Sequence, residues 1–292
     1  MIIDTHQHFY EPGTPRGKGP EDYKMLSGEE GVTGTILLAD QDFALKLAAE
    51  EPLVVGVVGR VVANKPEFKA EIDKWAANPL FRGIRQTGRE LEEIEKGSYL
   101  SDMEYLAAKD LTLDVFRVCG GGEAVTKVFS NGPRALSDYF GNPRSLAGLE
   151  RLADRVPKLR IIVSHIAHYP IDGKPMNQTW QDNFRKMAGH SNIYMKVSGL
   201  MERYVVTEHV KAPEAVSFYR PTLDILWKIF GEGRLVYGSD WPVCEHAGDF
   251  IANGLHIVKP YFAEKGEEAA RKFFWKNSQK VFKWVPRLPS QR

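Results

Sequence analysis

The feature that most constrains this chain is the regular alternation of short apolar runs with longer amphipathic stretches along its 292 residues. The runs are rich in β-branched residues and mostly apolar throughout, which is typical of parallel strands covered on both faces. The predicted strands are Ile2 to Thr5, Thr35 to Ala39, Leu53 to Gly59, Arg82 to Gln86, Leu111 to Arg117, Leu159 to Ser164, Ile193 to Ser198 and Leu235 to Gly238. The helical patterns between them include Phe43 to Glu50, Pro66 to Ala77, Leu146 to Arg155 and Pro221 to Phe230.

The number of strands distinguishes two parallel architectures. A doubly wound sheet more often stops at about five or six strands, whereas eight parallel strands close into a barrel. No shift in composition and no internal repeat divides the chain. We therefore predict an α/β fold, a single-domain (β/α)8 TIM barrel over residues 1–292.

Three stretches rich in Gly, Pro and Asn interrupt the alternation, and each follows a predicted strand. They are Glu11 to Pro20, Cys119 to Asn142, and Tyr169 to Thr179. In a barrel, such loops rise from the carboxyl ends of the strands, where active sites lie. The triplet Gly120 to Gly122 lacks the spacing of a dinucleotide-binding fingerprint, so we interpret it as part of a loop.

Charge and composition exclude several classes of partner. The 39 basic and 38 acidic residues give a net charge of +1, which gives no reason to expect nucleic acid or an anionic membrane. No apolar segment is long enough to span a bilayer, and the first residues do not resemble a signal peptide. The two cysteines, Cys119 and Cys244, lie far apart and are expected to be reduced thiols. We expect a cytoplasmic protein, and the sequence leaves open whether it forms a homo-oligomer.

Two histidines follow the first predicted strand, in the segment DTHQH of residues 4–8. Because side chains alternate along a strand, His6 and His8 are expected to point to one side and Gln7 to the other. Two imidazoles at the carboxyl end of a barrel strand can bind one metal ion or hold one substrate or water. Such a pair also arises by chance, but its position favours a functional pair.

An aspartate follows the last predicted strand, in the segment YGSDWP of residues 237–242. In a closed barrel the last strand lies beside the first, so Asp240 is expected next to His6 and His8. A carboxylate there can ligate a metal and accept the proton of an attacking water. The alternative is a helix N-cap, because Pro242 suits a first helical turn.

A third histidine, His165, ends the sixth predicted strand. A lone histidine after an apolar run is often a core residue, but its position favours a metal ligand or a donor to a reacting carbonyl. His168 lies three residues further on and is a second, weaker candidate for binding substrate. No Gly-x-Ser-x-Gly motif is present to anchor a serine nucleophile, and we expect Cys244 to be a packing residue.

Three cations lie in otherwise apolar strands: Arg85, Arg117 and Lys196. A charge in such a strand is unfavourable unless it is paired or functional. Converging on one mouth, these cations would bind a small anionic or polyhydroxylated substrate, since arginine holds a carboxylate through two hydrogen bonds. The alternative for each is a structural ion pair, with Asp114, Asp4 or Glu202 as the partner.

Four segments resemble one family from end to end: IDTHQHF at the start, RGIRQ near residue 82, NIYMKVSGL near 192 and RLVYGSDWPVC near 234. The closing FFWKNSQKVF is similar to that family's last helix. The chain resembles the amidohydrolase superfamily, in the branch of sugar lactonases and 2-pyrone-4,6-dicarboxylate lactonase. The resemblance implies a distorted TIM barrel with His6, His8, His165 and Asp240 in the active site. It also implies substrate-binding roles for Arg85, Arg117 and Lys196.

The chain departs from the branch in its substrate pocket. The lysine that often follows the sixth strand is missing from His165 to Pro170, and the loop from Cys119 to Asn142 looks longer than in simple sugar lactonases. No lysine stands beside Arg85 to bridge two metals, so at most one divalent ion is expected, with Zn²⁺ as first choice. The branch also contains metal-independent lactonases, which leaves both mechanisms open.

These observations predict a hydrolase, a lactonase in which Asp240 is the general base on water and His165 assists catalysis. A metal, if bound, would be held by His6, His8, His165 and Asp240. The alternative is a metal-dependent, non-oxidative decarboxylase of an aromatic or muconate-type acid. A protein that keeps the barrel only for binding is disfavoured because His6, His8 and Asp240 are all present.

Overall fold

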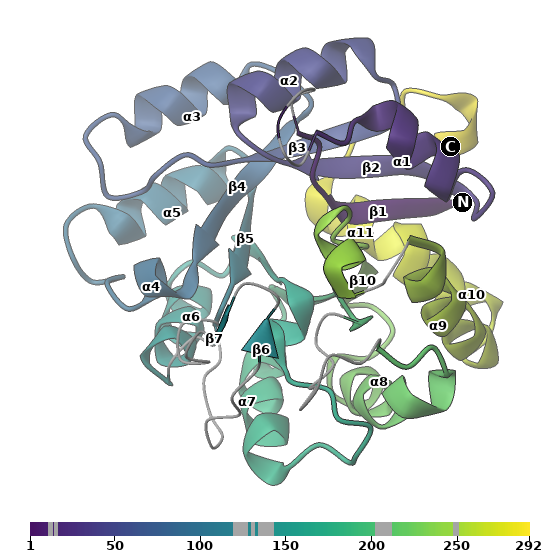
Figure 1. Cartoon of the computed structure of the whole chain (residues 1–292). Coiled ribbons are helices and arrows are strands. Elements are labelled where there is room, and N and C mark those ends of the chain that lie inside the picture. The colour runs from purple at the N-terminus through teal and green to yellow at the C-terminus, as the bar shows by residue number, and fades with distance from the viewer. Residues whose placement is uncertain are drawn as a thin grey trace.

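A computed structural model of the chain describes residues 1–10, 14, 17–118, 128–129, 132–133, 143–201, 212–247 and 251–292. Eight parallel strands form one sheet in the order β1-β2-β3-β4-β5-β8-β9-β10 (Figure 1). The strands are β1 (Ile2–Gln7), β2 (Val32–Leu38), β3 (Val54–Gly59), β4 (Phe81–Thr87), β5 (Thr112–Phe116), β8 (Arg160–Val163), β9 (Ile193–Val197) and β10 (Leu235–Tyr237). Each overlaps one predicted strand, and the predicted (β/α)8 barrel is confirmed.

The barrel closes where the segment after β10 meets β1. Gln7 and Trp241 form a parallel bridge, and the amide of His8 donates to the carbonyl of Trp241 at 2.8 Å. The amide of Asp240 donates to the carbonyl of His6, also at 2.8 Å. Closure therefore brings Asp240 directly beside the histidines of β1.

Helices surround the strands, as Figure 1 shows. They are α1 (Pro20–Ser27), α2 (Gln41–Glu50), α3 (Phe68–Ala76), α4 (Gly88–Leu91), α5 (Tyr99–Ala108), α6 (Pro143–Arg155), α7 (Gln178–Gly189), α8 (Val216–Phe230), α9 (Ile251–Glu264), α10 (Glu267–Arg271) and α11 (Asn277–Phe282). The helix predicted from Pro221 begins earlier, at Val216, so the proline lies inside it. The added turn buries Tyr219, whose hydroxyl donates to the carbonyl of Pro213 at 2.7 Å. Burial of this side chain outweighs the helix hydrogen bond that Pro221 cannot donate.

Much of the barrel interior is filled with apolar side chains. A cluster of strand residues packs there against the C-terminal segment, and its buried members are Ile3, Ile36, Leu38, Val55, Val58, Ile162, Tyr194, Val236, Val281, Phe282 and Trp284. The predicted closing helix is present as a π-helical turn, Lys272–Lys276, followed by α11. The side-chain amide of Asn277 donates to the carbonyls of Glu232 and Leu235, which ties α11 to the start of β10. We call this cluster the barrel floor.

The predicted loops are described only in part. Most of Cys119 to Asn142 lies outside the described residues, including the Gly120 to Gly122 triplet; a short antiparallel pair, β6 (Val128–Phe129) and β7 (Gly132–Pro133), is described. Much of Glu11 to Pro20 also lies outside them. Tyr169 to Thr179 is described and runs into α7.

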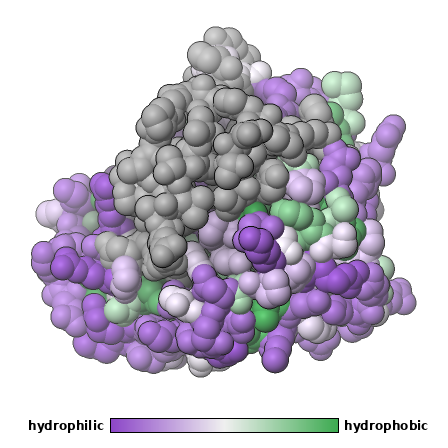
Figure 2. Space-filling model, turned by 60° about the horizontal axis from the view of Figure 1, so that its bottom comes forward, coloured by the Kyte–Doolittle hydropathy of each residue, from purple (hydrophilic) through white to green (hydrophobic). Residues whose placement is uncertain are grey.

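One face of the described surface is mainly hydrophilic (Figure 2). On the face shown in Figure 2, hydrophilic residues predominate outside the grey atoms, and the hydrophobic areas are small. Among the described residues, no helix combines the length and the apolar character needed to cross a membrane. Cys244 is a buried thiol, and Cys119 lies outside the described residues.

Candidate active site

His6 and His8 project from the carboxyl end of β1 to the same side, as alternation predicts. Their ring centroids lie 5.1 Å apart. Strict alternation would add Asp4 to that face, but a bulge between Asp4 and Gln7 places one extra residue opposite β2. The buried Asp4 carboxylate instead accepts hydrogen bonds from the Tyr23 hydroxyl at 2.7 Å and the Ser239 amide at 2.8 Å. Asp4 thus joins β1 to the segment after β10 instead of pairing with a cation.

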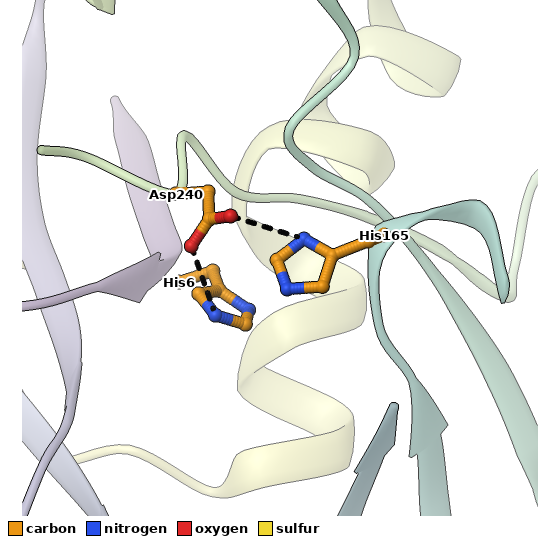
Figure 3. A group of neighbouring side chains, drawn as sticks. All are labelled: His6, His165 and Asp240. Atoms are coloured by element: carbon orange, nitrogen blue, oxygen red, sulfur yellow. Dashed lines mark ion pairs between the residues drawn. The ribbon is translucent and has the colours of Figure 1, made fainter. Parts of the chain in front are cut away.

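Asp240 lies between three imidazoles. Its Oδ1 is 3.3 Å from Nε2 of both His6 and His8, and its Oδ2 is 3.5 Å from Nδ1 of His165. Figure 3 shows the carboxylate between His6 and His165. Asp240 has a φ of 65°, in the left-handed region, so the chain turns sharply at this residue. We call His6, His8, His165 and Asp240 the histidine–aspartate cluster.

His165 begins a strained segment. Four consecutive non-glycine residues, 165–168, have φ between 50° and 63°. Left-handed backbone costs roughly 1–2 kcal/mol per residue, and such strain often marks functional sites. The turn places the His165 ring 4.3 Å from that of His6 and 5.2 Å from that of His168. Ser198 Oγ lies 3.0 Å from His165 Nδ1 and helps to hold the ring.

The wall beside the cluster carries the two predicted arginines. A terminal nitrogen of Arg85 lies 3.3 Å from Nε2 of His165, and 13% of the Arg85 side chain is exposed. The guanidinium carbon of Arg85 lies 4.3 Å from the centre of the Phe116 ring, and that of Arg117 lies 5.4 Å from it. The ring of His168 is 6.3 Å from that of Phe116. Arg85, Arg117 and His168 therefore gather around one aromatic side chain next to the cluster.

Lys196 lies deeper than the arginines. Its side chain and that of Asp114 are both 0% exposed, and Lys196 Nζ is 2.6 Å from Asp114 Oδ2. The structural ion pair that the sequence left open for Lys196 is therefore the arrangement found, with Asp114 as the partner. Arg85 Nε also lies 3.7 Å from Asp114 Oδ1. Lys196 thus lies beneath the histidine–aspartate cluster and not on the wall with Arg85 and Arg117.

Burial keeps the two histidines of β1 neutral. Burial lowers the pKa of His6 well below its usual value, and the neighbouring His165 and Lys196 lower it further. Burial, followed by the charge of Arg85, lowers the pKa of His8 to about 3. At neutral pH both imidazoles therefore retain one nitrogen lone pair that can ligate a metal or accept a hydrogen bond.

The cluster has the composition of a site for one metal ion. His6, His165 and Asp240 each offer a ligand atom, and these atoms lie within 4.8 Å of one another. Two observations show that the residues fit. His6 Nε2 is buried without a hydrogen-bond partner among the described residues. His8 Nδ1 lies 2.6 Å from the carbonyl of Leu38, and because a carbonyl can only accept, the hydrogen of His8 is on Nδ1. The lone pair of His8 Nε2 therefore faces Asp240. Two or three imidazoles with one carboxylate suit a divalent ion such as Zn²⁺.

Some residues of the site were not singled out from the sequence. Ser164 donates to Asp114 Oδ1 at 2.8 Å, and Ser198 contacts His165. Each of these serines ends a predicted strand, which was the available signal. Phe116 belongs to β5, yet it is only partly buried and lies between the two arginines. The sequence signal that could have identified Phe116 is its position directly before Arg117.

The sequence of the chain matches a known family along almost its whole length. A family model described as Amidohydrolase matches residues 3–284. One similar protein is L-fucono-1,5-lactonase from Burkholderia ambifaria. It is 29% identical over 281 residues, which cover 88% of this chain and 85% of the relative.

Solved structures share the fold at low sequence identity. An amidohydrolase from Burkholderia multivorans with bound zinc superposes with a TM-score of 0.75 at 19% identity, covering 97% of this chain and 99% of that one. A 5-carboxyvanillate decarboxylase from Sphingomonas paucimobilis gives a TM-score of 0.64 at 15% identity, covering 97% and 99%. At these identities the likeness supports the barrel and does not extend to the reaction.

Proposed function

The chain belongs to the amidohydrolase family, and from this premise we propose that it is a lactonase that opens a cyclic ester by attack of water. The observation that carries the proposal is the Asp240 carboxylate, within 3.3 to 3.5 Å of three imidazoles at the mouth of the barrel. A carboxylate held in this way can accept a proton from a water positioned over the barrel axis. Asp240 is therefore the general base.

The carbonyl oxygen of the lactone becomes negative when water attacks, so hydrogen-bond donors are needed near it. The guanidinium of Arg85 has only donors, and one of its terminal nitrogens lies 3.3 Å from His165 Nε2. With no metal bound, that histidine nitrogen accepts, so the hydrogen of His165 is on Nδ1, the atom that faces Asp240 and Ser198. Arg85, held by this contact with His165, can then orient the carbonyl and stabilise the oxyanion through its remaining N–H groups.

A divalent ion, with Zn²⁺ as first choice, would be held by His6, His8, His165 and Asp240. When bound, it would lower the pKa of a water and polarise the carbonyl. The B. multivorans structure carries zinc on the same fold, which supports the choice of metal to test. The proton acceptor remains Asp240 in either case, and Arg85, Arg117 and His168 remain the groups that would bind the substrate.

The substrate class follows from the wall and from the relative. L-fucono-1,5-lactonase acts on a sugar lactone, and the described wall offers Arg85, Arg117 and His168 to hydroxyls or a carboxylate. The partly buried Phe116 ring supplies an apolar surface for the carbon face of a sugar ring. A sugar-acid lactone with several hydroxyls fits this combination, and an anionic lactone is the second choice.

The test begins with metal analysis of the purified protein. A pH-indicator assay then compares L-fucono-1,5-lactone, other sugar lactones and 2-pyrone-4,6-dicarboxylate, with and without added Zn²⁺. The proposal predicts acid release above the spontaneous rate with at least one sugar lactone, and loss of that release in Asp240→Asn. Absence of acid release from every lactone, in both metal states, would contradict it.

The decarboxylase on the same fold defines the alternative reaction. The arginines of the wall could hold an aromatic carboxylate, so the same protein is assayed for CO2 release from hydroxylated benzoic acids. CO2 release without any lactone opening would replace the hydrolase proposal with the lyase.

A further inference from the structure

The interior of the barrel holds a buried ion pair that the proposed reaction does not use. Asp114 projects inward from β5 and Lys196 from β9, both with fully buried side chains. The ammonium lies above the floor residue Phe282, 5.3 Å from the centre of its ring. On its other side it lies 3.3 Å from Nδ1 of His6. The pair therefore separates the apolar floor from the histidine–aspartate cluster.

Every N–H of the Lys196 ammonium has one acceptor. Nζ lies 2.8 Å from the carbonyl of Thr5, 2.6 Å from Asp114 Oδ2 and 3.3 Å from His6 Nδ1. An ammonium has three donors and no acceptor, so the third N–H is directed to the histidine. His6 Nδ1 must then present its lone pair, and the single hydrogen of the neutral ring is on Nε2.

Ser164 favours the opposite hydrogen position on His6. Its hydroxyl hydrogen is used on Asp114 Oδ1 at 2.8 Å, so at 3.4 Å from His6 Nδ1 its oxygen can only accept. Ser164 therefore favours a hydrogen on Nδ1, and Lys196 favours a hydrogen on Nε2. A hydrogen bond from an ammonium is the stronger of the two, and an N–H aimed at that ammonium would be repelled.

We propose that Lys196, held by Asp114, is a positioning residue that keeps the hydrogen of His6 on Nε2. This rests on the proposed function only for its catalytic consequence. The Nε2–H then points into the space shared with Asp240 Oδ1, 3.3 Å away, where it can donate to an oxygen of the base, the water or the substrate. Ligation of a metal through Nε2 requires this hydrogen to move to Nδ1, where Ser164 Oγ can accept it.

The direct test reads the tautomer of His6. Long-range ¹⁵N–¹H spectra of the full chain, labelled in histidine and kept in chelator, distinguish a ring with Nδ1–H from one with Nε2–H. The His6 signals are assigned by their loss in His6→Asn. We expect Nε2–H in the wild type and Nδ1–H in Lys196→Met, which removes the ammonium but keeps an apolar side chain of similar length.

The kinetic test separates positioning from binding. Loss of a group that orients a site histidine typically lowers activity about 10- to 100-fold. In Lys196→Met we expect a fall of this size in kcat for lactone opening, with KM nearly unchanged because the arginine wall remains. The matched control is Lys283→Met, which removes a lysine paired with Asp110 at 2.6 Å, away from the cluster. It should leave both the tautomer and kcat unchanged.

A double variant keeps the test decisive if the single variant does not fold. If Lys196→Met does not fold because the buried Asp114 carboxylate loses its lysine, Asp114→Asn with Lys196→Met removes both charges and should show the same change of tautomer. An unchanged His6 tautomer in the folded variant, or Nδ1–H in the wild type, would overturn the inference. Absence of lactone opening would count against the proposed function and leave the tautomer result standing.

Discussion

The two ends of the barrel interior are built from the same strands but hold opposite kinds of side chain. On β9, Tyr194 belongs to the floor, Lys196 lies above it, and Ser198, just after the strand, contacts His165. On β1, the floor residue Ile3 is followed, after the bulge, by His6. Along β9 the interior thus changes from apolar to charged to reactive, and along β1 it changes from apolar to reactive, within a few residues.

Stability and chemistry are located at different ends of the barrel. The floor is closed by Phe282 and its neighbours from the C-terminal segment, and its interior is packed with apolar side chains. The mouth instead concentrates buried ionisable groups and left-handed backbone at His165 and Asp240, both of which are unfavourable for folding. We expect mutations at the floor to change stability and mutations at the mouth to change turnover.

The largest effect is expected from Asp240→Asn at the mouth. The amide keeps the size of the side chain but cannot take the proton from water. Loss of a general base lowers the rate about 10²- to 10⁴-fold, or roughly 3–5 kcal/mol. Steady-state kinetics should show this loss in kcat, with a smaller change in KM and an unchanged melting temperature. Wild-type kcat in this variant would point instead to a helix-capping aspartate, because asparagine caps nearly as well.

At the floor, Ile36→Ala should act on stability alone. Ile36 is fully buried, and removal of such a side chain costs about 2–5 kcal/mol of unfolding free energy. Chemical denaturation measures this loss, and kcat of the folded fraction should match the wild type. A drop in kcat without a drop in stability would show that the two ends are not separate.

Arg85→Met tests the wall beside the cluster. Methionine keeps much of the length but loses the guanidinium that contacts His165. A hydrogen bond to a charged group contributes about 1.5–3 kcal/mol, so kcat/KM should fall roughly 10- to 150-fold. An unchanged kcat/KM for the true substrate would assign Arg85 to structural pairing with Asp114.

The free energy of unfolding should fall in acid because His8 at the mouth is buried in its neutral form. The pKa of His8 falls to about 3 in the folded chain, against about 6.5 when unfolded, so the unfolded state binds the proton first. The free energy of unfolding should therefore be highest above pH 6.5 and fall by up to about 1.4 kcal/mol per pH unit as the pH drops toward 3. Denaturation at several pH values should give a shallower slope for His8→Gln. Equal slopes for both proteins would argue against a buried neutral His8.

Much of this arrangement could be predicted from the sequence. The eight apolar runs carry enough periodicity to define the strands, and closure of an eight-stranded barrel places Asp240 beside His6 and His8 without further information. His165 could be placed because it ends a strand that points into the same barrel. Strand-end positions are therefore the most informative sequence signal in this chain.

What could not be predicted depends on contacts between distant residues. The bulge that removes Asp4 from the histidine face, and the depth at which Lys196 meets Asp114, depend on how far each strand is shifted along its neighbour. Strand periodicity defines the face of a side chain and not its height in the barrel. The start of α8 was placed too late for the same reason, because its first turn depends on the burial of Tyr219 and not on a local pattern.

The central claim is that Asp240 is the base that activates water, and the pH dependence of kcat/KM tests it most directly. Lactone opening by the wild type should rise with pH as one ionisation of the free enzyme frees the base, which gives an acidic limb. The residual activity of Asp240→Asn, measured over the same range, should lack that limb. The same limb in both proteins, with the same apparent pKa, would contradict the account and assign the base to another group.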